Sequence, residues 1–170
     1  MTFEQPESDA YVSADRRYRY WLTRTWDDTL PVLPWVMLNP STADHRQDDP
    51  TIRRVARFSH DFGYGGLLVM NLFAFRATDP QEMMKADDPI GPENTDWLNE
   101  LIDRQRAAEQ PIVCGWGVFG DFKCRGKEWL RHAAGRGVTL LTLGETASGC
   151  PKHPLYLPSE QPLRPYGGAA

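Results

Sequence analysis

The sequence lacks the features of membrane-spanning and disulfide-rich proteins. No apolar run approaches the length of a membrane span, and we expect no signal peptide. The three cysteines are odd in number and match no zinc-binding spacing, so we expect a reduced, cytoplasmic protein. Because no His, Cys or carboxylate side chains recur at a spacing typical of metal ligands, we expect neither a metal nor a cofactor.

The chain also lacks an excess of positive charge, with 19 lysine and arginine residues against 23 aspartate and glutamate residues. The formal net charge is −4, which argues against binding nucleic acid through bulk charge. Local basic clusters are present, because Arg53 and Arg57 share a helix face, and Lys123 and Arg125 lie close together in the sequence. These four residues are candidates for contacting nucleic acid. Each is also typical of a solvated surface, where neighbouring aspartates offset the charge.

Apolar residues are plentiful enough for one packed domain. Hydrophobic residues make up 41% of the 170 positions. We expect a single domain over residues 15–158, after a loose lead-in over 1–14 and before an irregular, proline- and glycine-rich tail over 159–170. No internal repeat is present, and we expect a monomer.

Alternating strand and helix patterns predict an α/β domain. We expect a three-layer architecture, with helices on both faces of a mostly parallel central sheet. The period-two pattern of 16–26 predicts a strand that turns at 27–29 and pairs antiparallel with its return, 32–38, at the N-terminal side of the sheet. The other expected strands are 67–71, 112–116 and 138–143, and the expected helices are 50–62, a short one at Met83-Met84, 93–108 and 128–134.

Three of the apolar runs end in polar or glycine residues. They end at Asn39-Pro40-Ser41-Thr42, at Asn71 and at Trp116-Gly117, and a fourth block, His153-Pro154-Leu155-Tyr156-Leu157, follows later. In open α/β sheets a ligand binds at the carboxyl ends of the strands. We therefore expect these blocks to meet at one pocket.

The two asparagines suit hydrogen bonding to a substrate. Pro40 stiffens the loop after the first strand, so Asn39 would be held in place to position a water or a hydroxyl group. Asn71 closes an apolar strand, and its paired donor and acceptor suit the hydrogen-bonding edge of a nucleobase. The alternatives are an ordinary Asx turn for Asn39 and a loop-capping role for Asn71.

Trp116 and the histidine block have both structural and functional interpretations. Trp116 either fills the core, which is the better supported reading, or walls a pocket. Prolines on both sides of His153 fix its backbone, which suits hydrogen bonding to a developing anion, although a surface histidine without a role is the alternative. Leu155 and its apolar neighbours either pack into the core or form an exposed apolar projection.

The chain resembles a known but uncharacterised bacterial and phage family. The resemblance rests on Asn39-Pro40-Ser41-Thr42-Ala43-Asp44, on the run from Asn71 to Thr78, and on His153 to Pro158, and it covers about residues 18–158. Its signature residues include Asp44, Arg76, Thr78 and Asp79. The family brings no assigned function with it.

More distantly, the order of the blocks resembles the uracil-DNA glycosylase superfamily. This resemblance implies that Asn39 holds the attacking water, Asn71 reads the base edge, and His153 stabilises the departing base as an anion. Leu155 lies near the position at which glycosylases insert a residue into the base stack, in the space that the target base has left. The strongest uracil enzymes carry an aspartate where this chain has Asn39, and the aromatic residue that stacks on the base is not assignable here.

Taken together, the sequence predicts a nucleobase-recognising hydrolase that acts as an N-glycosylase on a modified or mismatched base in nucleic acid. Alternatives are a non-catalytic nucleotide- or nucleic-acid-binding module, or a hydrolase of free nucleotides. A basic rim around the pocket would favour duplex DNA, and its absence a small nucleotide ligand. The expected catalytic residues are Asn39 and His153, and the expected substrate-binding residues are Pro40, Ser41, Thr42, Asp44, Asn71, Phe73, Arg76, Trp116 and Leu155.

Overall fold

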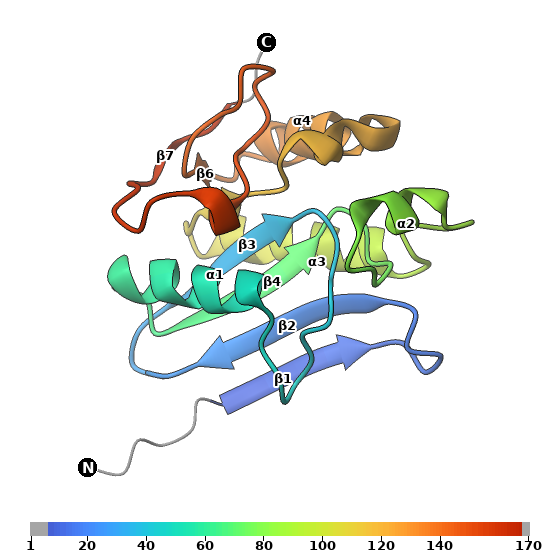
Figure 1. The fold of residues 1–170 in the computed structure, drawn as a ribbon. Helices are drawn as coiled ribbons and strands as arrows, with labels where there is room; N and C mark the ends of the chain where they lie inside the picture. Colours follow the sequence, from blue (N-terminus) through green and yellow to red (C-terminus); the bar gives the residue numbers. More distant parts are fainter. Residues whose placement is uncertain (1–6, 168–170) are drawn as a thin grey trace.

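A seven-stranded mixed sheet organises the molecule (Figure 1). The computed structural model describes residues 7–167. Along the sheet the strand order is β1-β2-β4-β3-β5-β6-β7. The strands are β1 (Glu7–Val12), β2 (Arg19–Thr25), β3 (Val32–Met37), β4 (Gly66–Asn71), β5 (Ile112–Cys114), β6 (Leu140–Thr142) and β7 (Arg164–Pro165).

The expected α/β class is confirmed, whereas the sheet is mixed and not mostly parallel. The central pairs β4–β3, β3–β5 and β5–β6 are parallel. The pairs β1–β2, β2–β4 and β6–β7 are antiparallel. The parallel part is where helical crossovers join the strands, because a parallel pair needs a long connection.

The expected hairpin between 16–26 and 32–38 does not form, because β4 lies between β2 and β3. Gly65 explains the insertion. Its N–H donates to the Pro31 carbonyl at 2.9 Å, and its own carbonyl accepts from the N–H groups of Trp26 and Asp27. A Cβ atom at this position would lie 1.9 Å from the Asp27 carbonyl oxygen, so only glycine lets the chain enter between the two strand ends.

The terminal segments are more ordered than the sequence suggested. Within the expected lead-in, residues 7–12 form the edge strand β1, and within the expected tail, residues 164–165 form β7. An edge strand buries only part of its side chains, which is why β1 reads as polar sequence. Tyr11 nevertheless packs on Tyr20 and Trp97, at ring-centroid distances of 5.3 and 5.6 Å. The rest of these two predictions, residues 1–6 and 168–170, lies outside the described part of the chain.

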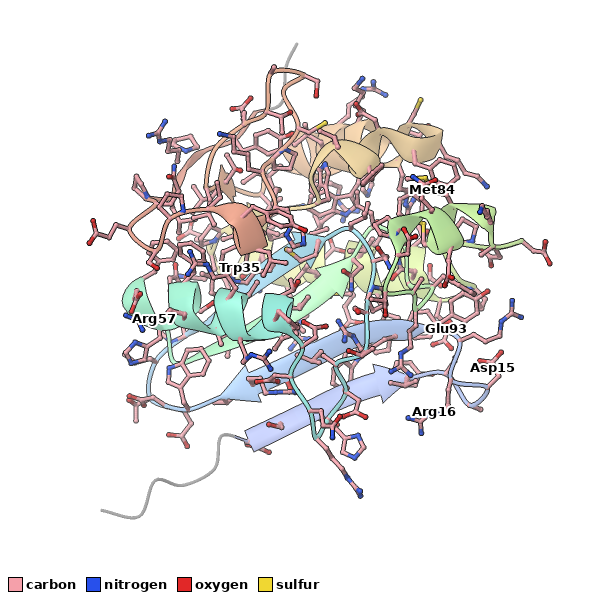
Figure 2. All side chains as sticks on the ribbon, viewed as in Figure 1. Asp15, Arg16, Trp35, Arg57, Met84 and Glu93 are labelled. Atoms are coloured by element: carbon pink, nitrogen blue, oxygen red, sulfur yellow. The ribbon has the colours of Figure 1, made fainter. Side chains whose placement is uncertain are left out.

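Helices cover both faces of the sheet. The helix α1 (Pro50–Asp61) packs on one face, where Trp35 lies beneath it and donates a hydrogen bond from Nε1 to Ser59 Oγ, while Arg57 is exposed (Figure 2). The other helices are α2 (Pro80–Lys85), α3 (Asn94–Ala107) and α4 (Arg125–Gly135). No helix among residues 7–167 is long and apolar enough to cross a membrane.

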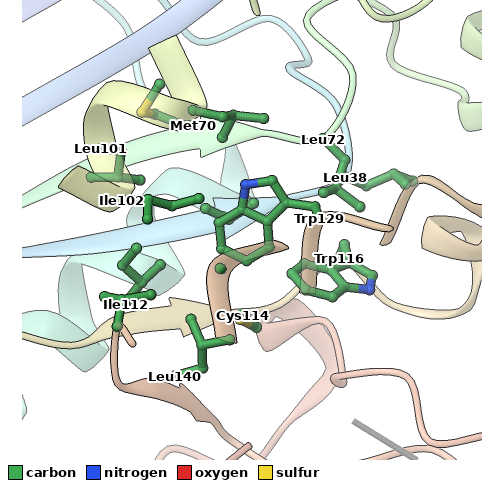
Figure 3. Close-up of a cluster of buried hydrophobic side chains, with 14 of the residues drawn as sticks. Leu38, Met70, Leu72, Leu101, Ile102, Ile112, Cys114, Trp116, Trp129 and Leu140 are labelled. Carbon is green, nitrogen blue, oxygen red and sulfur yellow. The ribbon is translucent and has the colours of Figure 1, made fainter. Parts of the chain in front are cut away.

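The core on the opposite face combines α3, α4 and the central strands. Leu101 and Ile102 of α3 and Trp129 of α4 pack against Met70 and Ile112 (Figure 3). Burying each large apolar side chain contributes roughly 1.5–3 kcal/mol relative to leaving it exposed. The same core includes Trp116, which follows β5 at the carboxyl end of the sheet.

Candidate functional site

A cavity of about 730 Å³ opens at the carboxyl ends of β3 and β5. Its walls come from the loop after β3, the start of α1, the loop before α2, the segment after β5 and the histidine block. The histidine block contains a short 3-10 helix, Pro154–Tyr156. Of the predicted site residues, Asn39, Ser41, Thr42, Trp116, His153 and Leu155 line this cavity.

The side-chain amide of Asn39 is fixed in one orientation. Its Nδ2 donates to the Ala77 carbonyl at 2.8 Å and to the Pro40 carbonyl at 3.2 Å. The Pro40 carbonyl also accepts from the Ala77 N–H at 2.9 Å, so the loops after β3 and β4 are joined through Pro40. With the amino group used, the Asn39 Oδ1 has no hydrogen-bond partner among residues 7–167 and remains an acceptor at the cavity wall.

His153 is a neutral hydrogen-bond donor at this wall. Its Nδ1 accepts from the Leu155 N–H at 3.3 Å, which places the proton of the neutral ring on Nε2. Burial lowers the pKa of His153 from 6.5 to about 4, and the charge of Asp49 opposes this shift. At neutral pH the imidazole is therefore uncharged. No hydrogen bond joins Nε2 to another described residue, so Nε2–H is available to a ligand.

Trp116 serves both the core and the cavity. Its side chain is 3% exposed and packs edge-on against Trp129 and Tyr166, at centroid distances of 5.7 and 6.0 Å. A Cβ atom on Gly120 would lie 2.0 Å from Trp116 Cδ1, so the next turn of chain passes directly over the indole. The two interpretations of Trp116 are thus compatible, because a core-anchored ring forms part of the cavity wall.

Several predicted substrate-binding residues lie away from the cavity. Asn71 is 1% exposed, does not line the cavity, and its Nδ2 is buried without a partner in the described chain. Phe73 is fully buried against Phe122. Asp44 Oδ1 accepts from the N–H groups of Arg46 and Gln47 and so shapes its own loop. Arg76 Nη1 is 3.4 Å from the Arg16 carbonyl and is also outside the cavity lining.

None of the predicted nucleic-acid contacts forms a basic rim. Arg57 is paired with Asp61 in α1, and Arg53 donates to the Asp48 carbonyl. Arg125 donates to the Leu72 carbonyl at 3.2 Å and to Thr95. Lys123 lies over the Phe122 ring. Among the described residues, Lys152 is the one lysine or arginine that lines the cavity.

Two site residues escaped the sequence analysis. Asp49 lines the cavity although it is only 7% exposed, and its role as the α1 cap concealed this position. Arg54 of α1 donates to the Leu157 carbonyl and stacks on Phe58 with 4.9 Å between guanidinium and ring. Arg54 therefore ties α1 to the histidine block. In the sequence, Arg54 is simply an arginine in a predicted helix. The residue pattern alone does not distinguish a partly buried arginine from a solvent-exposed one.

The exposed apolar residues gather partly at the cavity mouth. Val118, Phe119 and Tyr156 are 52%, 41% and 83% exposed, and all three line the cavity. Aromatic rings at a cavity mouth offer flat surfaces on which a planar ligand stacks. The mouth of the cavity thus presents exposed apolar and aromatic surface.

Comparisons with known proteins give a family without an activity. No curated protein and no solved structure matches the chain. A family model described as "Protein of unknown function (DUF1643)" matches residues 19–155, most of the sequence. The match includes Asn39, Asp49, Trp116 and His153, and so covers most of the residues that line the cavity. The chain therefore belongs to this family of proteins of unknown function, DUF1643.

Proposed function

We propose that this protein is a nucleobase-recognising hydrolase that cleaves the bond between a base and its sugar. The observation that carries the proposal is the pairing, in one cavity, of a fixed acceptor on Asn39 with a neutral donor on His153. Hydrolysis of such a bond needs a positioned water and a donor for the departing base. The order of the motifs, similar to that of the uracil-DNA glycosylase superfamily, supports the same assignment and a glycosylase-like arrangement of the fold.

In the proposed reaction, the bond from the anomeric carbon to the base nitrogen breaks, and its electron pair leaves with the base. The sugar becomes cation-like in the transition state, as in other glycoside cleavages. The His153 Nε2–H donates to the base as it becomes an anion, and Asn39 Oδ1 accepts a hydrogen bond from the attacking water. A neutral imidazole suits this role, because it stabilises the anion without first transferring its own proton.

The cavity matches one nucleoside in size and character. A volume of about 730 Å³ lies within the usual range of small-molecule sites, roughly 300–1,000 Å³. Trp116 supplies an apolar wall, while the hydroxyl groups of Ser41, Thr42 and Thr146 supply donors and acceptors. Because Asn71 lies outside the lining, these hydroxyl groups replace it in our account of base recognition.

The charges around the cavity favour a free nucleoside or nucleotide over duplex DNA, which makes a hydrolase of free nucleotides the second candidate. Binding a duplex relies on several lysine or arginine contacts to phosphates. Arg53, Arg57 and Arg125 are engaged elsewhere, and Lys152 alone reaches the cavity. One cation is enough for a single phosphate group.

The test is a base-release assay on two matched panels. One panel holds free nucleosides and nucleotides, and the other holds single- and double-stranded oligonucleotides with one uracil, hydroxymethyluracil, hypoxanthine, mismatched thymine or hypermodified pyrimidine. We expect release of one base, abolished in Asn39→Ala and His153→Ala, with folding checked by circular dichroism. Folded wild-type protein that releases nothing from either panel would contradict the hydrolase and leave a binding module.

A further inference from the structure

Asp49 places a carboxylate inside the cavity. The residue precedes α1, is only 7% exposed and lines the cavity wall. Its Oδ1 accepts from the Ile52 N–H at 2.9 Å. No described residue donates a hydrogen bond to its other oxygen, Oδ2. One oxygen therefore caps the helix, and the other is free to meet a ligand.

A buried arginine interacts electrostatically with Asp49. Arg19 lies beneath the loop, is 2% exposed and donates from Nη1 to the Ala43 carbonyl at 2.6 Å. Burial lowers the pKa of Arg19 to about 10, and Asp49 is the largest influence that opposes this shift. Arg19 thus remains protonated at neutral pH, and its positive charge balances a buried carboxylate that would otherwise be costly.

Helix capping alone does not account for a buried aspartate at this position. Serine, threonine and asparagine cap helices about as well and carry no charge to bury. Asp79 shows the ordinary case, because it caps α2 through Oδ1 and the Gln81 N–H at 2.9 Å from an exposed position outside the cavity. The neighbouring Asp48 also differs, since its carboxylate is held by Arg24 at 2.8 Å. Asp49 thus combines deep burial, a carboxylate oxygen without a donor and a place in the cavity wall, which together mark it as a candidate functional group.

We propose that Asp49 is a catalytic carboxylate of this cavity, which takes the proton of the attacking water and faces the cation-like sugar. This inference rests on the proposed function. Asn39 is an amide and cannot act as a strong base, so it orients the water while Asp49 Oδ2 receives the proton. His153, whose imidazole feels the Asp49 charge, stabilises the departing base.

The step balances without an additional reactant. The water oxygen bonds to the anomeric carbon, and the carbon–nitrogen bond breaks with its electron pair on the base. One water proton passes to Asp49 and then to the released base, which restores the carboxylate. The net change is nucleoside plus water to free sugar plus free base.

The experiment combines binding and turnover in wild type, Asp49→Asn and the matched control Asp79→Asn. Asparagine keeps the helix cap in both variants while it removes the charge. The binding probes are a pyrrolidine analogue of ribose, which is protonated at neutral pH, and its neutral tetrahydrofuran counterpart, both measured by calorimetry. Turnover is measured as base release from the same nucleoside and nucleotide panel.

We expect wild type and Asp79→Asn to bind the cationic ring roughly tenfold or more tightly than the neutral ring, and Asp49→Asn to lose this preference. Base release should fall at least about 100-fold in Asp49→Asn alone. Formate should restore part of the activity of Asp49→Gly, which a purely structural role would not predict.

The outcomes separate the two proposals. Base release by wild type that persists in Asp49→Asn would overturn the role of Asp49 and leave the hydrolase intact. Equal binding of both rings by wild type would likewise overturn it. An Asp49-dependent preference for the cationic ring, without base release from any substrate, would contradict the hydrolase and support Asp49 as the group that recognises a cationic ring.

Discussion

At the scale of single residues, the backbone of the site loops determines what each polar side chain offers to a ligand. The Leu155 N–H fixes the tautomer of His153, and the Ala77 carbonyl fixes the amide of Asn39. Both partners lie within residues 19–155, the part of the chain that the family model matches. Rigid placement of this kind lowers the cost of organising a site during reaction.

The first prediction concerns the pH dependence of stability through His153. The pKa of His153 falls from 6.5 to about 4 on folding because the ring is buried. Below pH 6.5 the unfolded chain binds a proton that the folded protein does not bind, so the unfolding free energy decreases as the pH falls from about 6.5 to about 4. The largest effect is about 3 kcal/mol. Urea unfolding of wild type and His153→Gln should show this loss in wild type only, and parallel curves would contradict it.

The second prediction concerns the orientation of Asn39. In Asn39→Asp a carboxylate oxygen replaces the amino group that faces the Ala77 and Pro40 carbonyls. We expect a loss of about 2 kcal/mol at pH 8, against about 1 kcal/mol for Asn39→Ala, which merely lacks the hydrogen bonds. Chemical denaturation of both variants measures the difference. An aspartate variant as stable as wild type would show that the amide is not held as described.

At the scale of elements, two buried arginines of β2 position the loop that carries Asp49. Arg19 donates to the Ala43 carbonyl, and Arg24 donates to the Asp44 carbonyl and the Asp48 carboxylate. Both arginines are less than 5% exposed. The antiparallel strand β2 therefore contributes to the cavity indirectly, by holding residues 43–49 over the sheet.

The third prediction tests this anchoring. Arg19→Met removes the hydrogen bond to Ala43 and leaves the buried Asp49 without its neighbouring cation, so we expect a destabilisation of about 3 kcal/mol. The rate of amide hydrogen exchange should increase over residues 43–52 much more than over α3. Arg57→Met, which alters an exposed pair, serves as the control and should change little. Equal exchange in the two variants would refute the anchoring role.

The sequence predicted local elements better than their arrangement. The helix that begins after Asp49 and the strand that ends at Asn71 were predicted within about one residue, because caps and apolar runs are local signals. The pairing of β2 with β4 was not predictable in this way. It depends on Gly65 passing between two strand ends, a contact between residues far apart in the sequence.

The site was predictable where a motif side chain reaches the cavity, as Asn39 and His153 do. It was not predictable for Asn71 or Asp49. Strand register turns Asn71 into the interior, where it is 1% exposed. Asp49 directly precedes the predicted helix, a position typical of a helix cap. Only the packing of α1 beside the histidine block shows that Asp49 also lines the cavity.

At the scale of the whole molecule, the charge distribution of the protein helps to distinguish between the proposed substrates, a polyanionic duplex and a small nucleotide. The net charge is −4, and the described arginines nearest the site are paired with carboxylates or carbonyl groups. An acidic protein without a basic rim has little long-range attraction for a polyanion. The exposed Phe119 and Tyr156 add aromatic surface, not charge, to the cavity lining.

The fourth prediction follows from this distribution. Binding to duplex DNA at about 150 mM salt should be weaker than about 100 μM, with fewer than about two counterions released. Fluorescence anisotropy with a labelled duplex over a series of salt concentrations measures both quantities. Micromolar binding with a steep salt dependence would instead show a phosphate-binding surface that the cavity does not account for.

The central claim, hydrolysis of a base–sugar bond, is tested most directly by following the oxygen of water. The wild-type protein is incubated with the nucleoside and nucleotide panel in water enriched in oxygen-18, and the products are analysed by mass spectrometry. The account predicts an unlabelled free base together with a sugar that carries one oxygen-18, and neither product with His153→Ala. Label in the base or the phosphate, or no labelled product from any substrate, would contradict the account.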